Sequence, residues 1–263
     1  MPKALSELVQ PDNHGAPKQQ LLKDQHAAED KLLVFYNHGS TTAAKDPTQR
    51  SFFLEKEMQP VTTMKYSLGR NINEKCPLPR KIAQSIPFSS AKLPEVLNKL
   101  SMEPTSMEAA VIQGTIQDCA SGTLNGEDRY CATSLESMAD FAMSKLGRNV
   151  QAFKTEVEKG AALQKYTVKP GVKKVNDGGN FILCHKLTYA NAVFFCHTFG
   201  QTRAYVVPLQ GADRTTASAV AICHLDTSAW NPKNHPLQEV KVKPGTVPVC
   251  HYLPQGHIAW VRK

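Results

Sequence analysis

The stretch from residue 184 to residue 251 contains the dipeptide Cys-His four times, as Cys184-His185, Cys196-His197, Cys223-His224 and Cys250-His251. The chain has 7 Cys and 9 His in 263 residues, so a shuffled sequence would contain roughly a quarter of one such dipeptide. Ten residues separate the first two pairs, and twenty-five residues separate each of the later ones. The repetition therefore indicates one shared structural or chemical role.

The segments that carry these pairs have the composition of β-strands. They are rich in Val, Ile, Phe and Tyr, and Gly, Pro, Asn and Asp separate them. Adjacent side chains of a strand point to opposite faces of the sheet, so each pair sends a thiol to one face and an imidazole to the other. We expect disulfides on the packed face and four imidazoles gathered on the opposite face. The predicted strands are Asn180–Cys184, Ala192–His197, Ala204–Leu209, Ala217–His224 and Val247–Tyr252.

This arrangement predicts a metal site made of imidazoles. The gap of two to four residues that separates the ligands of zinc fingers is absent. If the thiols form disulfides, the remaining ligands are His185, His197, His224 and His251. Imidazole-only sites favour copper by ligand type and affinity order, with zinc second. Four cysteines allow three disulfide pairings, and the sequence does not choose among Cys184, Cys196, Cys223 and Cys250.

The four pairs resemble the signature of the plant BURP domain, and the match extends to other motifs. A double-Phe motif opens the matching region, and a short His-Ile-Ala-Trp-Val segment closes it. The resemblance covers roughly residues 51–263, which makes an unrelated fold improbable. The matching motifs are Ser51–Lys56, Ser85–Ser90 with Lys92–Pro94, Tyr130–Met138, Asp226–Pro232, Pro244–His251 and His257–Val261.

The resemblance implies a function. Some BURP proteins are copper-dependent peptide cyclases that oxidatively crosslink a Tyr or Trp ring within a core peptide ahead of their own domain. Residues 31–40 resemble such a core, with Tyr36 as the crosslinked aromatic residue and Leu33 or Val34 as its partner. Copper, as one or two ions, and dioxygen as oxidant are then expected on the four histidines. The chain's own core peptide would be the substrate, and a downstream protease would release the product, as in ribosomal peptide natural-product biosynthesis.

Three other interpretations remain open at this point. The apolar run within residues 31–40 could instead be an edge strand or an anchor that docks on the domain. Family members also include non-catalytic secreted, seed or cell-wall-associated proteins. A third interpretation is a zinc-stabilised scaffold whose histidines never change redox state. The repeats found ahead of the domain in some relatives are absent here, which favours the short-tailed seed or cyclase type.

Composition sets the domain organisation and the expected partners. Residues 1–50 have the polar composition of a flexible tail that carries the core, and residues 51–263 are long enough for one domain. The formal charge of +8 is spread along the chain without a binding motif, so we expect no nucleic-acid partner. No segment reaches transmembrane length, so we expect no membrane association. The cysteines favour the secretory pathway, extracellular or vacuolar, with a signal peptide already removed.

The fold is predicted to be α+β, with N-terminal helices packed on an antiparallel β-sheet system in a single disulfide-stapled domain. Apolar stripes predict helices over Met107–Cys119 and Leu135–Leu146, the second opened by a Thr133-x-x-Glu136 capping box and closed by Gly147. A shorter helix over Leu93–Leu100 is expected before them. Further strands are predicted over Val150–Glu156 and Leu163–Val175.

The remaining cysteines and polar residues have separate expectations. Cys119 and Cys131 flank a polar loop, which suits a disulfide that closes the turn between two helices. Cys76 is left over as the free thiol, since the number of cysteines is odd. Three residues near the pairs are candidates to orient the ligand imidazoles, namely Asp226, His235 and His257. Asp226 could equally cap a turn in Asp-Thr-Ser.

Overall fold

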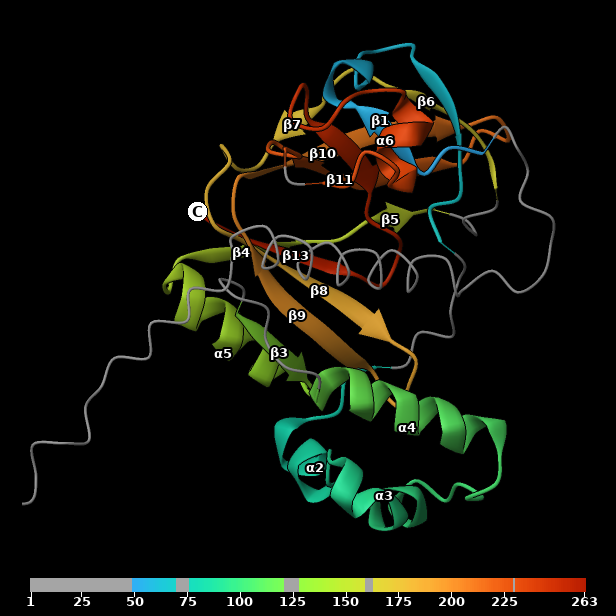
Figure 1. The fold of residues 1–263 in the computed structure, drawn as a ribbon, viewed down its shortest axis with the longest axis vertical. Helices are drawn as coiled ribbons and strands as arrows, with labels where there is room; N and C mark the ends of the chain where they lie inside the picture. The colour runs from blue at the N-terminus through green and yellow to red at the C-terminus, as the bar shows by residue number, and fades with distance from the viewer. Residues whose placement is uncertain (1–48, 70–75, 121–127, 159–162, 229) are drawn as a thin grey trace, which may run out of the picture.

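The computed structural model describes residues 49–69, 76–120, 128–158, 163–228 and 230–263. Two antiparallel β-sheets lie one beyond the other, and most of the helices lie at the smaller sheet (Figure 1). The expected mixed architecture with antiparallel sheets and three disulfides is confirmed. No helix of the described residues has the length and apolar character needed to cross a bilayer.

The larger sheet has eight strands, and it contains the second half of the Cys-His repeat. Its main order is β1-β12-β11-β10-β6-β2, with β5 paired to β11 and β7 paired to β10. Its strand pairs are antiparallel, with Phe52 opposite His251 and Cys223 opposite Cys250. Its strands are β1 (Phe52–Leu54), β2 (Thr63–Tyr66), β5 (Glu156–Val157), β6 (Gln164–Val168), β7 (Lys173–Lys174), β10 (Thr202–Gly211), β11 (Thr216–His224) and β12 (Val249–Tyr252).

The smaller sheet has five strands in the order β3-β9-β8-β13-β4, and it contains the first half of the repeat. Its centre is the antiparallel pair β8 and β9, in which Cys184 lies opposite Cys196. The chain therefore alternates between the two sheets, because β13 follows β12 directly but pairs with β8. Its strands are β3 (Arg129–Ala132), β4 (Val150–Phe153), β8 (Phe181–Leu187), β9 (Val193–Phe199) and β13 (Ile258–Arg262).

Most of the helices precede most of the strands in the chain, and two of them pack against strands of the smaller sheet. Met138, Ala142 and Leu146 of α5 are buried in one cluster with Ile182 and Phe194 of that sheet. The other helices before it form the end of the molecule opposite the larger sheet (Figure 1). The helices are α2 (Arg80–Ser85), α3 (Leu93–Lys99), α4 (Met107–Ala120), α5 (Leu135–Leu146) and α6 (His235–Val240), with 3₁₀ turns η1 (Glu55–Glu57) and η2 (Ser90–Lys92).

A buried cluster joins the two sheets, and it defines which strand faces look toward each other. Phe181 and Leu183 of β8 pack there with Ile222 of β11 and Val261 of β13. Leu253, in the connection between β12 and β13, is completely buried in the same cluster. The facing surfaces of β8 and β11 thus carry the odd-numbered residues of β8 and the even-numbered residues of β11.

The helix predictions were correct in position and partly wrong in detail. Ile112 and Ile116 of α4 are buried as expected, but Met107 is 76% exposed because it lies at the free start of the helix. Leu135 at the start of α5 is 51% exposed for the same reason. The residue that caps α5 is Ser134 rather than Thr133, since the Ser134 hydroxyl accepts a hydrogen bond from the Ser137 amide.

Two predicted strands are each divided in the structure. The Val150–Glu156 prediction corresponds to β4 and β5, which belong to different sheets. The Leu163–Val175 prediction corresponds to β6 and β7, which pair separately with β10. Gly171 lies between β6 and β7 with φ at +107°, a conformation that interrupts a regular strand. Composition detected the extended segments but not the point at which the chain changes partner.

The disulfides complete the framework. Cys184 bonds to Cys196 and Cys223 bonds to Cys250, which resolves the three pairings that the sequence allowed. Cys119 bonds to Cys131 as predicted, although the bond joins α4 to strand β3 and not two helices. Cys76 is the free, exposed cysteine, also as predicted.

Candidate metal centre

Each Cys-His pair divides its two side chains between opposite faces of a sheet. Cys184 and Cys196 are buried on the face of the smaller sheet that packs against α5. Cys223 and Cys250 are buried on the face of the larger sheet that holds Tyr66 and Tyr252. Because adjacent residues of a strand alternate, the four imidazoles occupy the other faces, on the side of the core shared by the two sheets.

The first imidazole pair comes from the smaller sheet. His185 and His197 lie on either side of the Cys184–Cys196 bond, and their side chains are only 5% and 2% exposed. Their Nε2 atoms are 3.2 Å apart. Two nitrogens bound to one tetrahedral ion at about 2.0 Å would lie roughly 3.3 Å from each other. The spacing of these two lone-pair positions therefore fits joint ligation of one ion.

His257 supports this first pair from the connection between β12 and β13. Its Nδ1 lies 3.2 Å from Nδ1 of His185, so one of these two nitrogens donates a proton to the other. If His185 Nε2 offers its lone pair to an ion, its proton resides on Nδ1 and points to His257. A hydrogen bond of this kind fixes the tautomer and the orientation of a ligand imidazole.

The second imidazole pair comes from the larger sheet. His224 at the end of β11 and His251 in β12 are stacked, with ring centroids 5.7 Å apart and an interplanar angle of 23°. His251 Nδ1 lies 3.3 Å from the carbonyl oxygen of Tyr252, and this contact favours the tautomer with the proton on Nδ1. The Nε2 lone pair of His251 is then the one that remains for another partner.

Burial and neighbouring imidazoles lower the pKa values of rings in both pairs. Burial lowers the pKa of His185 well below its usual range, and nearby His197, His257 and His251 lower it further. Burial, with His251 and His197, lowers the pKa of His224 to about 3. Burial also lowers the pKa values of His251 and His257 to about 4 each. These rings are consequently neutral near pH 7, which is the protonation state in which imidazole binds a metal.

The match to a complete metal site is partial. Among the described residues, no three His, Cys, Asp or Glu side chains are arranged to hold one ion together. The structure provides two imidazole pairs in one region, and the spacing that fits an ion occurs at His185 and His197. The donor set of neutral nitrogens fits copper, with zinc second.

The other two candidate orienting residues lie elsewhere. Asp226 is exposed, and its Oδ1 accepts a hydrogen bond from the Ser228 amide, which is the turn-capping alternative. The Ser228 side chain, followed by the Ser228 amide, lowers the pKa of Asp226 by hydrogen bonding to its carboxylate. His235 lies on α6, with its Nδ1 3.6 Å from a carboxylate oxygen of Glu239. Phe52 lies near both His235 and the second pair, with its ring centroid 6.0 Å from those of His235 and His251.

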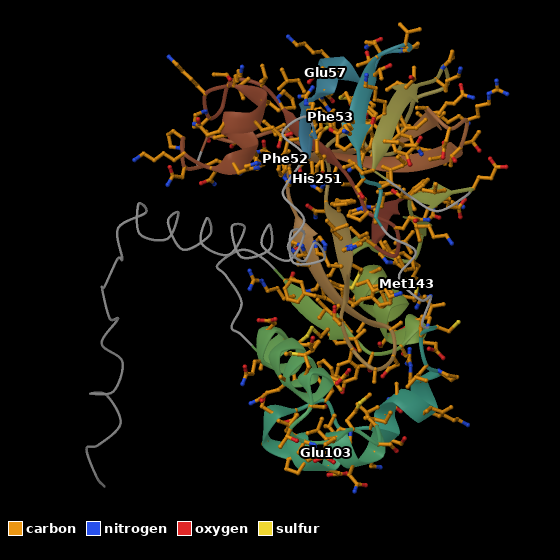
Figure 2. The ribbon with its side chains drawn as sticks, turned by 90° about the vertical axis from the view of Figure 1, so that its right-hand side faces the viewer. Phe52, Phe53, Glu57, Glu103, Met143 and His251 are labelled. Atoms are coloured by element: carbon orange, nitrogen blue, oxygen red, sulfur yellow. A yellow bond between two sulfur atoms is a disulfide. The ribbon has the colours of Figure 1, made fainter. Side chains whose placement is uncertain are left out.

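Aromatic side chains around the imidazoles had no site role in the sequence interpretation. The ring centroids of Trp230 and His224 are 5.3 Å apart in an edge-on arrangement, and those of Phe195 and His197 are 5.4 Å apart. Figure 2 shows Phe52 close to His251 where β1 meets β12. Trp230 and Phe52 both belong to motifs that were recognised in the sequence, so motif membership was the available signal.

The proposed substrate residues Leu33, Val34 and Tyr36 lie outside the described residues. The described chain begins at residue 49, immediately before the strand that pairs with His251. The segment that precedes the domain is therefore joined to it next to the second imidazole pair.

The BURP domain family pattern matches residues 51–262. The chain belongs to the BURP domain family. It is 47% identical over 234 residues to BURP domain-containing protein 3 of Oryza sativa, a match that covers 86% of this chain and 54% of that protein. It is 45% identical over 233 residues to the BURP domain protein RD22 of Arabidopsis thaliana, covering 86% of this chain and 59% of RD22.

A third relative is similar in size to this chain. BURP domain-containing protein 6 of Oryza sativa is 41% identical over 234 residues, and the match covers 88% of this chain and 97% of that protein. By contrast, the matches to the first two relatives span little more than half of those proteins. The match identifies this chain as a plant-type BURP domain, and the family name specifies no reaction.

Proposed function

We propose that this protein is a copper-dependent oxidative peptide cyclase that acts on its own N-terminal segment. The observation that supports the proposal is the placement of His185, His197, His224 and His251 on the strand faces that look toward the core between the two sheets. The lowered pKa values of His185, His224 and His251 keep these three rings neutral near pH 7. The Cys184–Cys196 and Cys223–Cys250 disulfides lie on the opposite faces and join the strands that carry these histidines. In this proposal residues 51–263 act as one stapled domain whose helices brace the sheets.

The residues present would hold copper through imidazole nitrogens. His185 and His197 would supply one pair of ligands and His224 and His251 the other, for one shared ion or for two. Copper bound there would supply one-electron oxidation, with dioxygen as the final electron acceptor. His257 would keep His185 in the required tautomer through the contact between their Nδ1 atoms.

Formation of the crosslink removes two hydrogen atoms from the peptide. Joining the ring or phenolic oxygen of Tyr36 to Leu33 or Val34 forms one bond and removes one hydrogen from each partner. The peptide thus loses two protons and two electrons, and one dioxygen takes up both to give hydrogen peroxide. The domain contributes by binding and orienting the tyrosine, and Phe52 and Trp230 limit the access of water to His251 and His224.

The connection of the N-terminal segment supports reaction within one chain. Phe52 lies opposite His251 in the β1–β12 register. A flexible tether of about ten residues spans roughly 17 Å. A short tether of this kind gives the attached group a high effective concentration at a nearby site.

The test is mass spectrometry of the proteolysed protein. After incubation with Cu(II) and dioxygen, we expect a fragment containing residues 32–38 that is lighter by two hydrogens, with Tyr36 in the crosslink. Copper-loaded, folded protein with an unchanged fragment would refute the proposal. A mass loss that persists in Tyr36→Phe would show that another residue is crosslinked.

A non-catalytic secreted protein is the second candidate, and the three disulfides favour it equally. Disulfides of this kind fit a secreted or extracellular protein, and we propose the secretory pathway as its route. Metal analysis separates this candidate and the zinc scaffold from the cyclase. Zinc without copper in protein purified from its native source, with no crosslinked fragment, would favour the scaffold.

A further inference from the structure

The N-terminal segment enters the domain at a point that several contacts fix. The Glu239 side chain of α6 accepts hydrogen bonds from two successive backbone amides, Ser51 at 2.7 Å and Phe52 at 3.1 Å. One oxygen, Oε1, receives both bonds. The Glu239 side chain is 16% exposed, so these charge-assisted bonds are largely shielded from water.

Arg50, which precedes Ser51, is also fixed by hydrogen bonds. The Arg50 amide donates to the carbonyl oxygen of Lys65 at 2.9 Å, and the Arg50 guanidinium binds the Glu57 carboxylate at 2.7 Å. Three consecutive residues, 50 to 52, are therefore fixed to three separate elements. Figure 1 shows α6 beside β1, which is where the Glu239 contact is made.

This attachment lies beside one imidazole of the second pair. The centroid of the Phe52 ring is 6.0 Å from the ring centroids of both His235 and His251. Phe52 itself is only 6% exposed and packs with Leu237 of α6 and Val249 of β12. The Glu239 contact therefore helps the β1–β12 pairing to fix the start of the N-terminal segment relative to His251.

We infer that Glu239 is a positioning residue that anchors the start of the N-terminal segment beside His251. By fixing that origin, it determines which residues of the segment reach the imidazole region. This inference rests on the proposed function for the reaction, but the anchoring can be measured without it.

The anchoring is tested by local exchange and cleavage in Glu239→Gln and Glu239→Ala. Glutamine keeps one neutral acceptor oxygen and alanine removes both, so opening of residues 50–52 should increase in the order wild type, Gln, Ala. We expect roughly ten-fold faster amide exchange at Ser51 and Phe52 in the alanine variant, with faster trypsin cleavage after Arg50. Glu95→Gln, the same charge change on α3 beside Lys92, is the matched control and should alter neither.

The positioning is tested by comparing two substrates. In Glu239→Ala, crosslinking of the attached segment should fall several-fold, while crosslinking of a separate peptide of residues 31–40 should stay at the wild-type rate. Unchanged crosslinking of the attached segment, in a variant with faster exchange at Ser51, would overturn the positioning role and leave the proposed function intact.

The two failures are distinguishable. If wild-type protein crosslinks neither substrate, the proposed function and the positioning role both fail. The anchoring is then decided by exchange alone, and equal exchange at Ser51 and Phe52 in all variants would overturn it. Thermal unfolding of each variant identifies a general loss of folding, for which the glutamine variant provides the milder comparison.

Discussion

Removal of the Cys223–Cys250 bond should cost more stability than removal of either other disulfide. The bond closes a separation of 27 residues, whereas the other two each close 12. Chain entropy alone predicts a loss of about 3.5 kcal/mol for the longer loop and about 2.8 kcal/mol for each shorter one. The perturbation is the double substitution Cys223→Ala with Cys250→Ala.

The burial of the cysteines predicts different stability losses for the two disulfides that close shorter loops. Cys184 and Cys196 are completely buried, as Cys223 and Cys250 are. Loss of a buried sulfur adds on the order of 1 kcal/mol for each side chain replaced by alanine. Cys119 and Cys131 are only partly buried, so they lose less packing. The expected order of destabilisation is the 223–250 pair, then 184–196, then 119–131.

The assay is urea unfolding of metal-free protein, followed by circular dichroism, with the slope m compared among variants. Cys76→Ser serves as the control, because Cys76 is free and exposed and should change stability by less than about 0.5 kcal/mol. If the 223–250 variant lost the least of the three, the loop-length reasoning would be refuted. A changed m in only one variant would instead identify an altered denatured state.

Three further predictions follow from the site and the helices. His185→Ala should weaken Cu(II) binding in calorimetry more than His257→Ala, because only His185 faces His197 through Nε2; equal losses would contradict this division. Metal-free protein should lose stability as the pH falls from about 6.5 toward about 3, because the unfolded chain takes up a proton that folded His224 does not. The slope is roughly 1.4 kcal/mol per pH unit for each such histidine, and a flat profile in urea unfolding would contradict it. Met138→Ala should cost about 2 to 5 kcal/mol because Met138 is completely buried, whereas Met107→Ala on exposed surface should cost under about 0.5 kcal/mol in the same assay.

The alternation of the strands could be predicted because it depends only on neighbours in the chain. A Cys-His step in an extended segment must divide thiol and imidazole between two faces. The structure places Cys184 with the α5 cluster and His185 on the opposite face. The disulfide pairing could not be predicted in the same way, because it depends on which strands are adjacent. Cys223 meets Cys250 only because α6 and its loops return the chain to β11.

The helices illustrate a second limit. A stripe of apolar residues predicts a helix, but the partner determines how much of the stripe is covered. Ile112 and Ile116 pack with Val193 of β9, whereas Met107 at the start of the same helix is 76% exposed. The α5 cap was assigned to Thr133 when Ser134 performs it, since both hydroxyl residues suit that role and the difference of one position is set by local backbone angles.

The gathering of histidines from two sheets required the fold. The sequence separates His197 from His224 by twenty-five residues and gives no sign that they belong to different sheets. The link is the crossover from β12 to β13, which also carries His257 to His185. His257 was a candidate by proximity to the last pair, yet it contacts the first one, because β13 pairs with β8.

In each pair the histidine directly follows the cysteine. The strand alignment that allows the disulfide to form therefore also determines which face the imidazole occupies. Shifting β9 by one residue relative to β8 would turn Cys196 away from Cys184 and would at the same time turn His197 away from His185. Only the alignment that lets the sulfurs meet presents both rings to the interior. Formation of the Cys184–Cys196 bond during folding would therefore retain the strand alignment in which His185 and His197 share one face.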